Sequence, residues 1–109
     1  KEENLQAVYQ GMYLVTNGSH GTLRTAFNDL PVKVAAKTGT AEEDKNRSSH
    51  TWFVCFAPFD DPQIAITVMI PFGEGSGTPA PAVAKAIIRE YLGLDYTPTN
   101  TTMQTVLAE

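Results

Sequence analysis

Two short apolar segments separated by a proline-rich turn constrain the fold of this 109-residue chain more than any other feature. Residues 51–57 and 63–70 are rich in aromatic and β-branched side chains, which is typical of β-strands. The five residues between them, 58–62, include two prolines and two adjacent aspartates, which favour a turn. We therefore predict an antiparallel hairpin, with Asp60 and Asp61 as turn residues.

Helical patterns flank this hairpin on both sides. From Leu5 the apolar residues recur at spacings of three, four and three, which predicts an amphipathic helix that ends at Asn17-Gly18. A second helix is expected after Pro81, with Gly93 as its C-terminal stop. A short helix is expected over residues 22–27, capped by Thr22.

A further strand is expected from Val32, where apolar and polar residues alternate up to Lys37. The order of elements predicts an α+β fold, an antiparallel sheet with the N-terminal and C-terminal helices packed on one face. Residues 1–96 are expected to form a single domain. Residues 97–109, which contain five threonines and little apolar periodicity, are expected to be a poorly ordered tail.

Composition excludes several classes of partner. Hydrophobic residues make up 42% of the chain and charged residues 18%, which is too apolar for an intrinsically disordered protein. The net charge is -4 and no basic stripe is present, so we expect neither nucleic acid nor an anionic membrane surface as a partner. The longest apolar run, residues 52–57, is far too short to cross a bilayer, so this segment is not expected to contact the membrane.

Residues 73–77 read Gly73-x-Gly75-x-Gly77 and lie between a predicted strand and a predicted helix, the setting of a phosphate-binding loop. The spacing does not match the dinucleotide fingerprint, which would require glycine at Thr78. The expected strand before the loop also belongs to a hairpin instead of a βαβ unit. We therefore interpret this loop as a connection and expect no nucleotide cofactor.

The histidines and the cysteine also give no metal site. His20 and His50 are the only histidines, and no metal-ligand spacing joins them. Cys55 lies among apolar residues that raise a thiol's pKa, so it is expected to be an inert core residue. His50 is expected to be a structural or surface residue. No metal or organic cofactor is predicted.

The segment Lys37-Thr38-Gly39-Thr40 is the strongest candidate site. On an extended strand Thr38 and Thr40 point the same way and offer two hydroxyl donors to one carboxylate, while Lys37 adds a cation. Gly39 has no Cβ, so another extended backbone can lie close to the strand, as a peptide added to a sheet edge requires.

A resemblance to a known protein family includes these four residues and extends beyond them. The stretches 34–42 and 50–58, the 64–70 strand, a glycine-rich turn and an alanine-rich closing helix, in this order, resemble the end of a class B penicillin-binding protein, a peptidoglycan D,D-transpeptidase. The resemblance covers about residues 5–95. It implies the C-terminal part of a serine β-lactamase/transpeptidase-like fold.

The chain departs from the family pattern at one decisive point. None of its serines is followed by Lys three residues on or by Asn two residues on, so the nucleophile motif and the second motif are missing. In the family both motifs precede Lys-Thr-Gly, and we therefore expect the nucleophile to lie in a parent chain upstream of Lys1. The serines are Ser19, Ser48, Ser49 and Ser76.

The resemblance implies a role for each residue of the segment. Lys37 would orient proton transfer and attract the substrate carboxylate, and Thr38 and Thr40 would bind the carboxylate of a stem peptide or a β-lactam. The Thr40 backbone N–H would supply one oxyanion-hole donor. This chain alone is expected to be inactive and to need the remainder of the parent domain as its partner.

The resemblance also implies a location, the extracytoplasmic face of a bacterial cell membrane, with the anchor in a parent segment outside this chain. A D,D-carboxypeptidase, a β-lactamase or a β-lactam sensor shares the same triplet and remains an alternative. A small α+β interaction module without enzymatic activity is the alternative from a different class.

Overall fold

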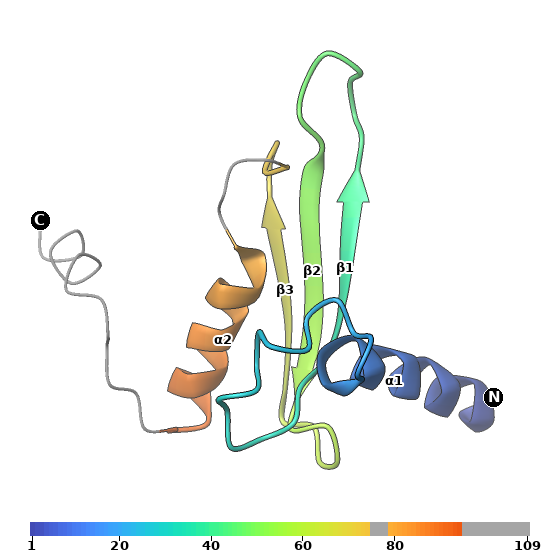
Figure 1. Cartoon of the computed structure of the whole chain (residues 1–109), viewed down its shortest axis with the longest axis vertical. Coiled ribbons are helices and arrows are strands. Elements are labelled where there is room, and N and C mark those ends of the chain that lie inside the picture. Colours follow the sequence, from blue (N-terminus) through green and yellow to red (C-terminus); the bar gives the residue numbers. More distant parts are fainter. Residues whose placement is uncertain (75–78, 95–109) are drawn as a thin grey trace, which may run out of the picture.

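A computed structural model describes residues 1–74 and 79–94. Its three strands form one antiparallel sheet in the order β1-β2-β3 (Figure 1). One helix precedes the first strand along the chain and one follows the last strand. The predicted α+β class, antiparallel sheet and hairpin are confirmed. The predicted tail lies outside the described residues. In chain order the elements are α1 (Glu2–Asn17), β1 (Ala35–Ala41), β2 (His50–Ala57), β3 (Ile64–Ile70) and α2 (Ala80–Tyr91).

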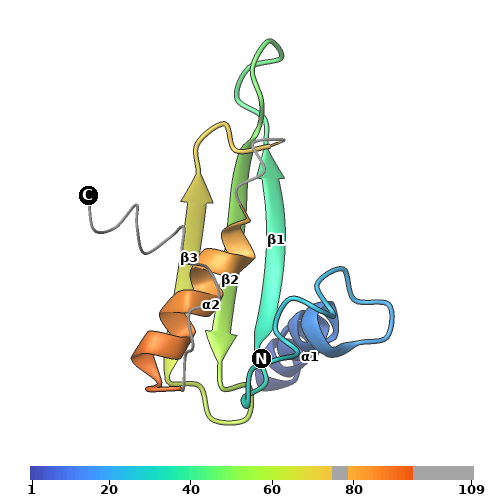
Figure 2. The ribbon, with the colours of Figure 1, turned by 60° about the vertical axis from the view of Figure 1, so that its left-hand side comes forward.

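The core lies between α2 and one face of the sheet. Side chains alternate between the two faces of a strand, and in β2 the buried residues Phe53, Cys55 and Ala57 all belong to the same face. α2 packs on this face through Ala84 and Ile88, which are fully buried one helical turn apart. Figure 2 shows α2 lying in front of β2 and β3. The helix ends where predicted, before Gly93, whose positive φ of 64° favours glycine.

α1 contacts the sheet from a different side. The Tyr9 ring lies 5.3 Å from that of Phe56, and Phe56 alternates with the core residues of β2, so it belongs to the opposite face. The placement of the two helices therefore differs from the expectation that both pack on one face. The apolar stripe predicted α1 correctly as a helix, but spacing along a helix carries no information about which sheet face it meets.

The first half of α1 projects beyond the sheet, as Figure 1 shows. Leu5 is 48% exposed and Val8 is 57% exposed, although both belong to the apolar stripe of the helix. At the other end of α1, the buried hydroxyl of Thr16 donates a hydrogen bond to the carbonyl oxygen of Val34, and the Asn17 amide donates to the same oxygen at 3.0 Å. These bonds attach the end of α1 to the residue before β1.

The predicted helix over residues 22–27 is wrong, because the structure has consecutive turns there. The Ala26 N–H donates to the Leu23 carbonyl at 3.0 Å, three residues back, while the Leu23 N–H donates to the Val15 carbonyl of α1 at 3.0 Å, so no helical series of bonds forms. A helix nucleus is costly and a six-residue segment is too short to repay it. Instead the segment is anchored by Phe27, which is buried and whose ring stacks at 6.1 Å on that of Phe53.

β1 begins at Ala35, three residues later than predicted, and continues to Ala41. The carbonyl of Lys33 accepts a hydrogen bond from the Phe59 N–H at 2.9 Å, and that of Val34 is occupied by α1. Since these acceptors are already used, the ladder with β2 starts after them. The segment 37–40 consequently lies within the strand instead of at its end.

Candidate functional site

The four candidate residues lie on the exposed half of an edge strand. β1 pairs with β2 on one side, through cross-strand partners such as Thr38 with Phe53 and Thr40 with Thr51, and it is the terminal strand of the sheet. All residues from Lys37 to Ala41 are exposed, whereas the two that precede them in β1 are buried. The described residues therefore leave the outer backbone edge of this segment open to an incoming extended chain.

The side chains of the segment alternate as the sequence predicted. Thr38 and Thr40 belong to the sheet face on which α2 packs. Both lie outside the part that α2 covers, so they remain exposed. Lys37 and Gly39 belong to the opposite face. The structure thus brings the two hydroxyls to one side of a single exposed strand, while the Lys37 side chain leaves the strand on the other side and its ammonium contacts the strand backbone.

Lys37 has no carboxylate partner among the described residues. Its Nζ donates a hydrogen bond to the carbonyl oxygen of the next residue, Thr38, at 2.6 Å. Because this contact is local and exposed, it leaves the ammonium available to a ligand anion.

Gly39 is not required by the packing of the described chain. A Cβ built on Gly39 would lie 3.6 Å from the Cβ of its cross-strand partner Trp52, an ordinary van der Waals distance. Gly73 is different, because a Cβ there would approach Ile70 side-chain atoms to 2.6 Å. The glycine at 73 therefore serves a tight turn after β3, and the glycine at 39 keeps a surface free.

The structure gathers residues around His50 that the sequence analysis missed. The His50 ring contacts Glu43 at 2.8 Å and the backbone N–H of Phe72 at 2.9 Å. Glu43 and Arg47 belong to the loop that was predicted only as a solvated segment. No sequence periodicity marks them, because Glu43 contacts a histidine beyond the loop and Arg47 lies over the Phe72 ring in the turn after β3.

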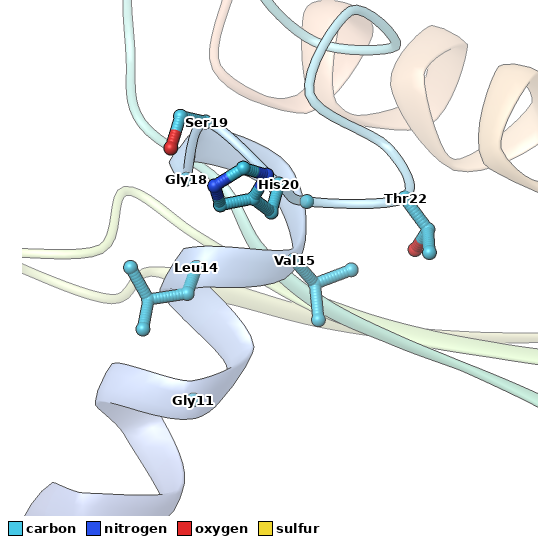
Figure 3. Close-up of a pocket in the computed structure, with 8 residues that line it drawn as sticks. Gly11, Leu14, Val15, Gly18, Ser19, His20 and Thr22 are labelled. Carbon is cyan, nitrogen blue, oxygen red and sulfur yellow. The ribbon is translucent and has the colours of Figure 1, made fainter.

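The structure also shows where the other residues considered in the sequence analysis lie. Cys55 is buried, and its desolvation raises the pKa of the thiol to about 11, which fits the predicted inert core residue. His20 lies at the turn after α1, where it lines a shallow pocket of about 360 Å³ with Leu14 and Val15 (Figure 3). Asp60 and Asp61 are exposed in the β2–β3 turn, as predicted.

Two findings concern the whole described chain. No helix in residues 1–74 or 79–94 is long and apolar enough to cross a membrane. In the same residues, no three metal-ligating side chains lie together.

The amino-acid sequence of this chain is similar to those of known proteins. Residues 1–89 match the family model of the penicillin-binding protein transpeptidase domain. The peptidoglycan D,D-transpeptidase MrdA of Haemophilus influenzae is 34% identical over 101 residues, which cover 80% of this chain and 16% of that protein. Penicillin-binding protein 2B of Streptococcus pneumoniae is 34% identical over 96 residues, covering 83% of this chain and 14% of that protein.

Solved structures of penicillin-binding proteins are also similar to this chain. Pseudomonas aeruginosa PBP2, in complex with WCK 5153, superimposes with a TM-score of 0.74 at 36% identity, covering 87% of this chain and 20% of that one. Helicobacter pylori PBP2 gives a TM-score of 0.72 at 32% identity, covering 88% and 18%. This chain therefore spans about a seventh to a fifth of the length of these relatives. With the family model covering most of its length and relatives of the PBP2 and MrdA type, the chain belongs to the class B penicillin-binding protein transpeptidase family.

Proposed function

We propose that this chain is the substrate-binding and β-lactam-binding C-terminal part of a peptidoglycan D,D-transpeptidase that acts through an acyl-serine intermediate. The observation that supports the proposal best is the exposed segment 37–40 on the open edge of β1, in a chain of this family. The nucleophilic serine belongs to residues outside this chain, because no serine here has the motif spacing. The proposed location is the extracytoplasmic face of a bacterial membrane, where peptidoglycan is assembled.

The proposed chemistry is acyl transfer from a stem peptide that ends in D-Ala-D-Ala. The serine oxygen of the parent attacks the carbonyl carbon between the two alanines, the C–N bond breaks, and the terminal alanine leaves with the proton. An amine of a second stem peptide then attacks the acyl-serine ester and releases the serine. In a β-lactam the ring amide is the bond that opens, so the leaving amine stays attached.

The candidate residues bind and stabilise charge in this scheme. The Thr38 and Thr40 hydroxyls donate hydrogen bonds to the terminal carboxylate, and the Lys37 ammonium attracts that carboxylate and orients proton transfer. The Thr40 N–H is one donor to the developing oxyanion. The remainder of the parent domain completes the site with the serine and the second donor.

The test uses the complete parent protein and a fluorescent penicillin, with the covalent adduct measured on denaturing gels. The wild-type parent should be labelled, and Lys37→Ala should slow labelling by at least roughly 100-fold, the scale of lost proton-transfer assistance. Lys33→Ala is the matched control, since Lys33 is an exposed lysine just before β1, and its rate should be unchanged. No adduct on the wild-type parent would remove the enzymatic proposal.

The hydroxyl roles have a separate test. Replacing Thr38 and Thr40 together with valine keeps the β-branched shape of both side chains but removes both donors, so labelling should slow while the thermal unfolding temperature stays constant. An unchanged labelling rate would reject their assigned role. The isolated 109-residue chain should not be labelled, and a covalent adduct on it would show that this chain carries a nucleophile of its own.

A further inference from the structure

The loop between β1 and β2 is tied to the turn after β3 through one imidazole ring. The Phe72 backbone N–H donates a hydrogen bond to His50 Nδ1 at 2.9 Å. The other ring nitrogen, Nε2, lies 2.8 Å from a carboxylate oxygen of Glu43. The His50 side chain is only 19% exposed, and its bond with the Phe72 N–H is partly buried, whereas the Glu43 carboxylate on the other side of the ring is exposed.

These two contacts define the tautomer of His50. A backbone N–H is always a donor, so Nδ1 must accept and carries no proton. The proton of the neutral ring is then on Nε2, which donates to the Glu43 carboxylate. His50 can join the two segments in this way only as the neutral Nε2–H form.

Further contacts join the same two segments. The Arg47 guanidinium lies 3.5 Å above the centre of the Phe72 ring. Ser49 and Glu74 pair in both directions, through Ser49 N–H to the Glu74 carboxylate at 3.3 Å and Glu74 N–H to the Ser49 carbonyl at 3.1 Å. Phe72 has a positive φ of 51°, an unfavourable conformation for a bulky residue, and these contacts hold it there.

We call these contacts between residues 43–50 and residues 72–74 the clamp. The position of His50 connects the clamp to the candidate site. His50 is the cross-strand partner of Ala41, and the next pair along the ladder is Thr51 with Thr40. The clamp therefore lies where β1 ends, one residue beyond Thr40. A change in the loop at this point would move the end of the edge strand that presents the carboxylate-binding hydroxyls.

We propose that His50 is a positioning residue, which holds the outer end of β1 in its ligand-binding place by tying the β1–β2 loop to the β3–α2 turn as a neutral Nε2–H imidazole. This role deepens the proposed function and rests on it. His50 touches neither substrate nor nucleophile in this role and acts through the strand end.

Protonation of the ring should open the clamp. A proton on Nδ1 turns this acceptor into a donor that faces the Phe72 N–H, so the bond between them is lost. The charged groups around the ring are Glu43, which attracts the cation, Arg47, which stacks on Phe72 and repels it, and Glu74, which is bound to the neighbouring Ser49 backbone. The charged ring therefore stays with Glu43 and releases the turn.

The first experiment measures the ring itself in the complete parent protein labelled with ¹⁵N-histidine. At neutral pH the His50 signals should show a proton on Nε2 and none on Nδ1, and the Phe72 amide should exchange slowly with deuterium. On acidification His50 should gain the second proton and the Phe72 amide should lose its protection together. A proton on Nδ1 at neutral pH, or an unprotected Phe72 amide, overturns the clamp whatever the activity of the parent.

The second experiment measures the acylation rate of the parent by fluorescent penicillin against pH. His50→Leu removes both contacts and should slow acylation roughly five- to tenfold, the factor that corresponds to one lost hydrogen bond. His50→Asn keeps an acceptor for the Phe72 N–H that cannot take up a proton, so it should restore most of the rate and should not show the fall in rate that we expect of the wild type on acidification. Lys45→Gln, an exposed change in the same loop, is the control and should keep the wild-type profile.

The two experiments separate the possible failures. A parent that penicillin never acylates overturns the proposed function and with it the positioning role, while the ¹⁵N measurement still decides the tautomer. A parent that is acylated, with His50→Leu as fast as wild type, overturns the positioning role alone. An acid-side fall that persists in His50→Asn assigns the pH dependence to another group and also overturns it.

Discussion

At the residue scale, two glycines illustrate how the same amino acid serves different purposes. Gly39 has room for a side chain within the described structure, whereas Gly73 does not. Gly39 thus lies on an open strand surface, which we propose is kept free for a ligand, whereas Gly73 lies in a turn that needs a close approach to Ile70.

Alanine substitutions test the contrast directly. Gly39→Ala should change the free energy of unfolding by less than about 0.5 kcal/mol but should slow penicillin acylation of the parent, because the new methyl group obstructs an added strand. Gly73→Ala should destabilise the protein by about 1 to 3 kcal/mol, because a Cβ would overlap Ile70. Chemical denaturation and acylation rates measure both; a destabilised Gly39→Ala protein would mean that glycine is needed there for folding.

Cys55 gives a pH-dependent prediction at the same scale. Burial raises the pKa of its thiol from 9.0 to about 11, so the folded protein holds this proton where the unfolded chain has released it. The stability contributed by the neutral thiol is complete below pH 9 and is lost as the pH rises to about 11, with a total loss on the order of 2 kcal/mol. Cys55→Ala should remove this decline in urea denaturation between pH 9 and pH 11. An identical decline in the variant would assign the loss to other groups.

At the scale of elements, the junction of α1 with β1 depends on side-chain hydrogen bonds to a backbone carbonyl. Thr16 is the one buried polar residue of the described core, and its hydroxyl donates to Val34. This contact and the Asn17 amide attach the end of α1 to the residue just before Ala35, where β1 begins.

Thr16→Val should therefore weaken this junction. The valine keeps the shape of the side chain but removes one donor from a buried carbonyl, and we expect a loss of about 1 kcal/mol in the free energy of unfolding. Thr16→Ser keeps the hydroxyl and should retain most of the stability. If valine and serine had equal effects on thermal unfolding, the hydrogen bond would not be the cause.

At the scale of the whole molecule, the sheet face opposite α2 is only partly covered. Trp52, Val54 and Met69 lie on this face and are 40%, 37% and 43% exposed. Lys37 and Gly39 belong to the same face, so the apolar surface continues into the candidate site. Such a surface is expected to be covered by other parts of a protein, which agrees with the proposed need for the remainder of the parent domain.

The isolated chain should consequently associate as its concentration rises. Trp52→Gln combined with Met69→Gln should reduce this association, measured by analytical ultracentrifugation, because it removes apolar area from the exposed face. Thr67→Gln lies on the same face but leaves the apolar area in place, so it should associate like the wild type. A monomeric wild-type chain at high concentration would contradict the expected association.

The sequence by itself determined the hairpin, the two long helices, the buried cysteine and the extended conformation of residues 37–40, because each depends on local spacing or on a few adjacent residues. Only the tertiary structure decided that the helices meet different faces, that residues 22–27 form turns and that β1 starts at Ala35. It also decided that His50 joins the β1–β2 loop to the turn after β3. These features depend on contacts between segments far apart in the chain, and the free energy of such contacts is absent from any local pattern.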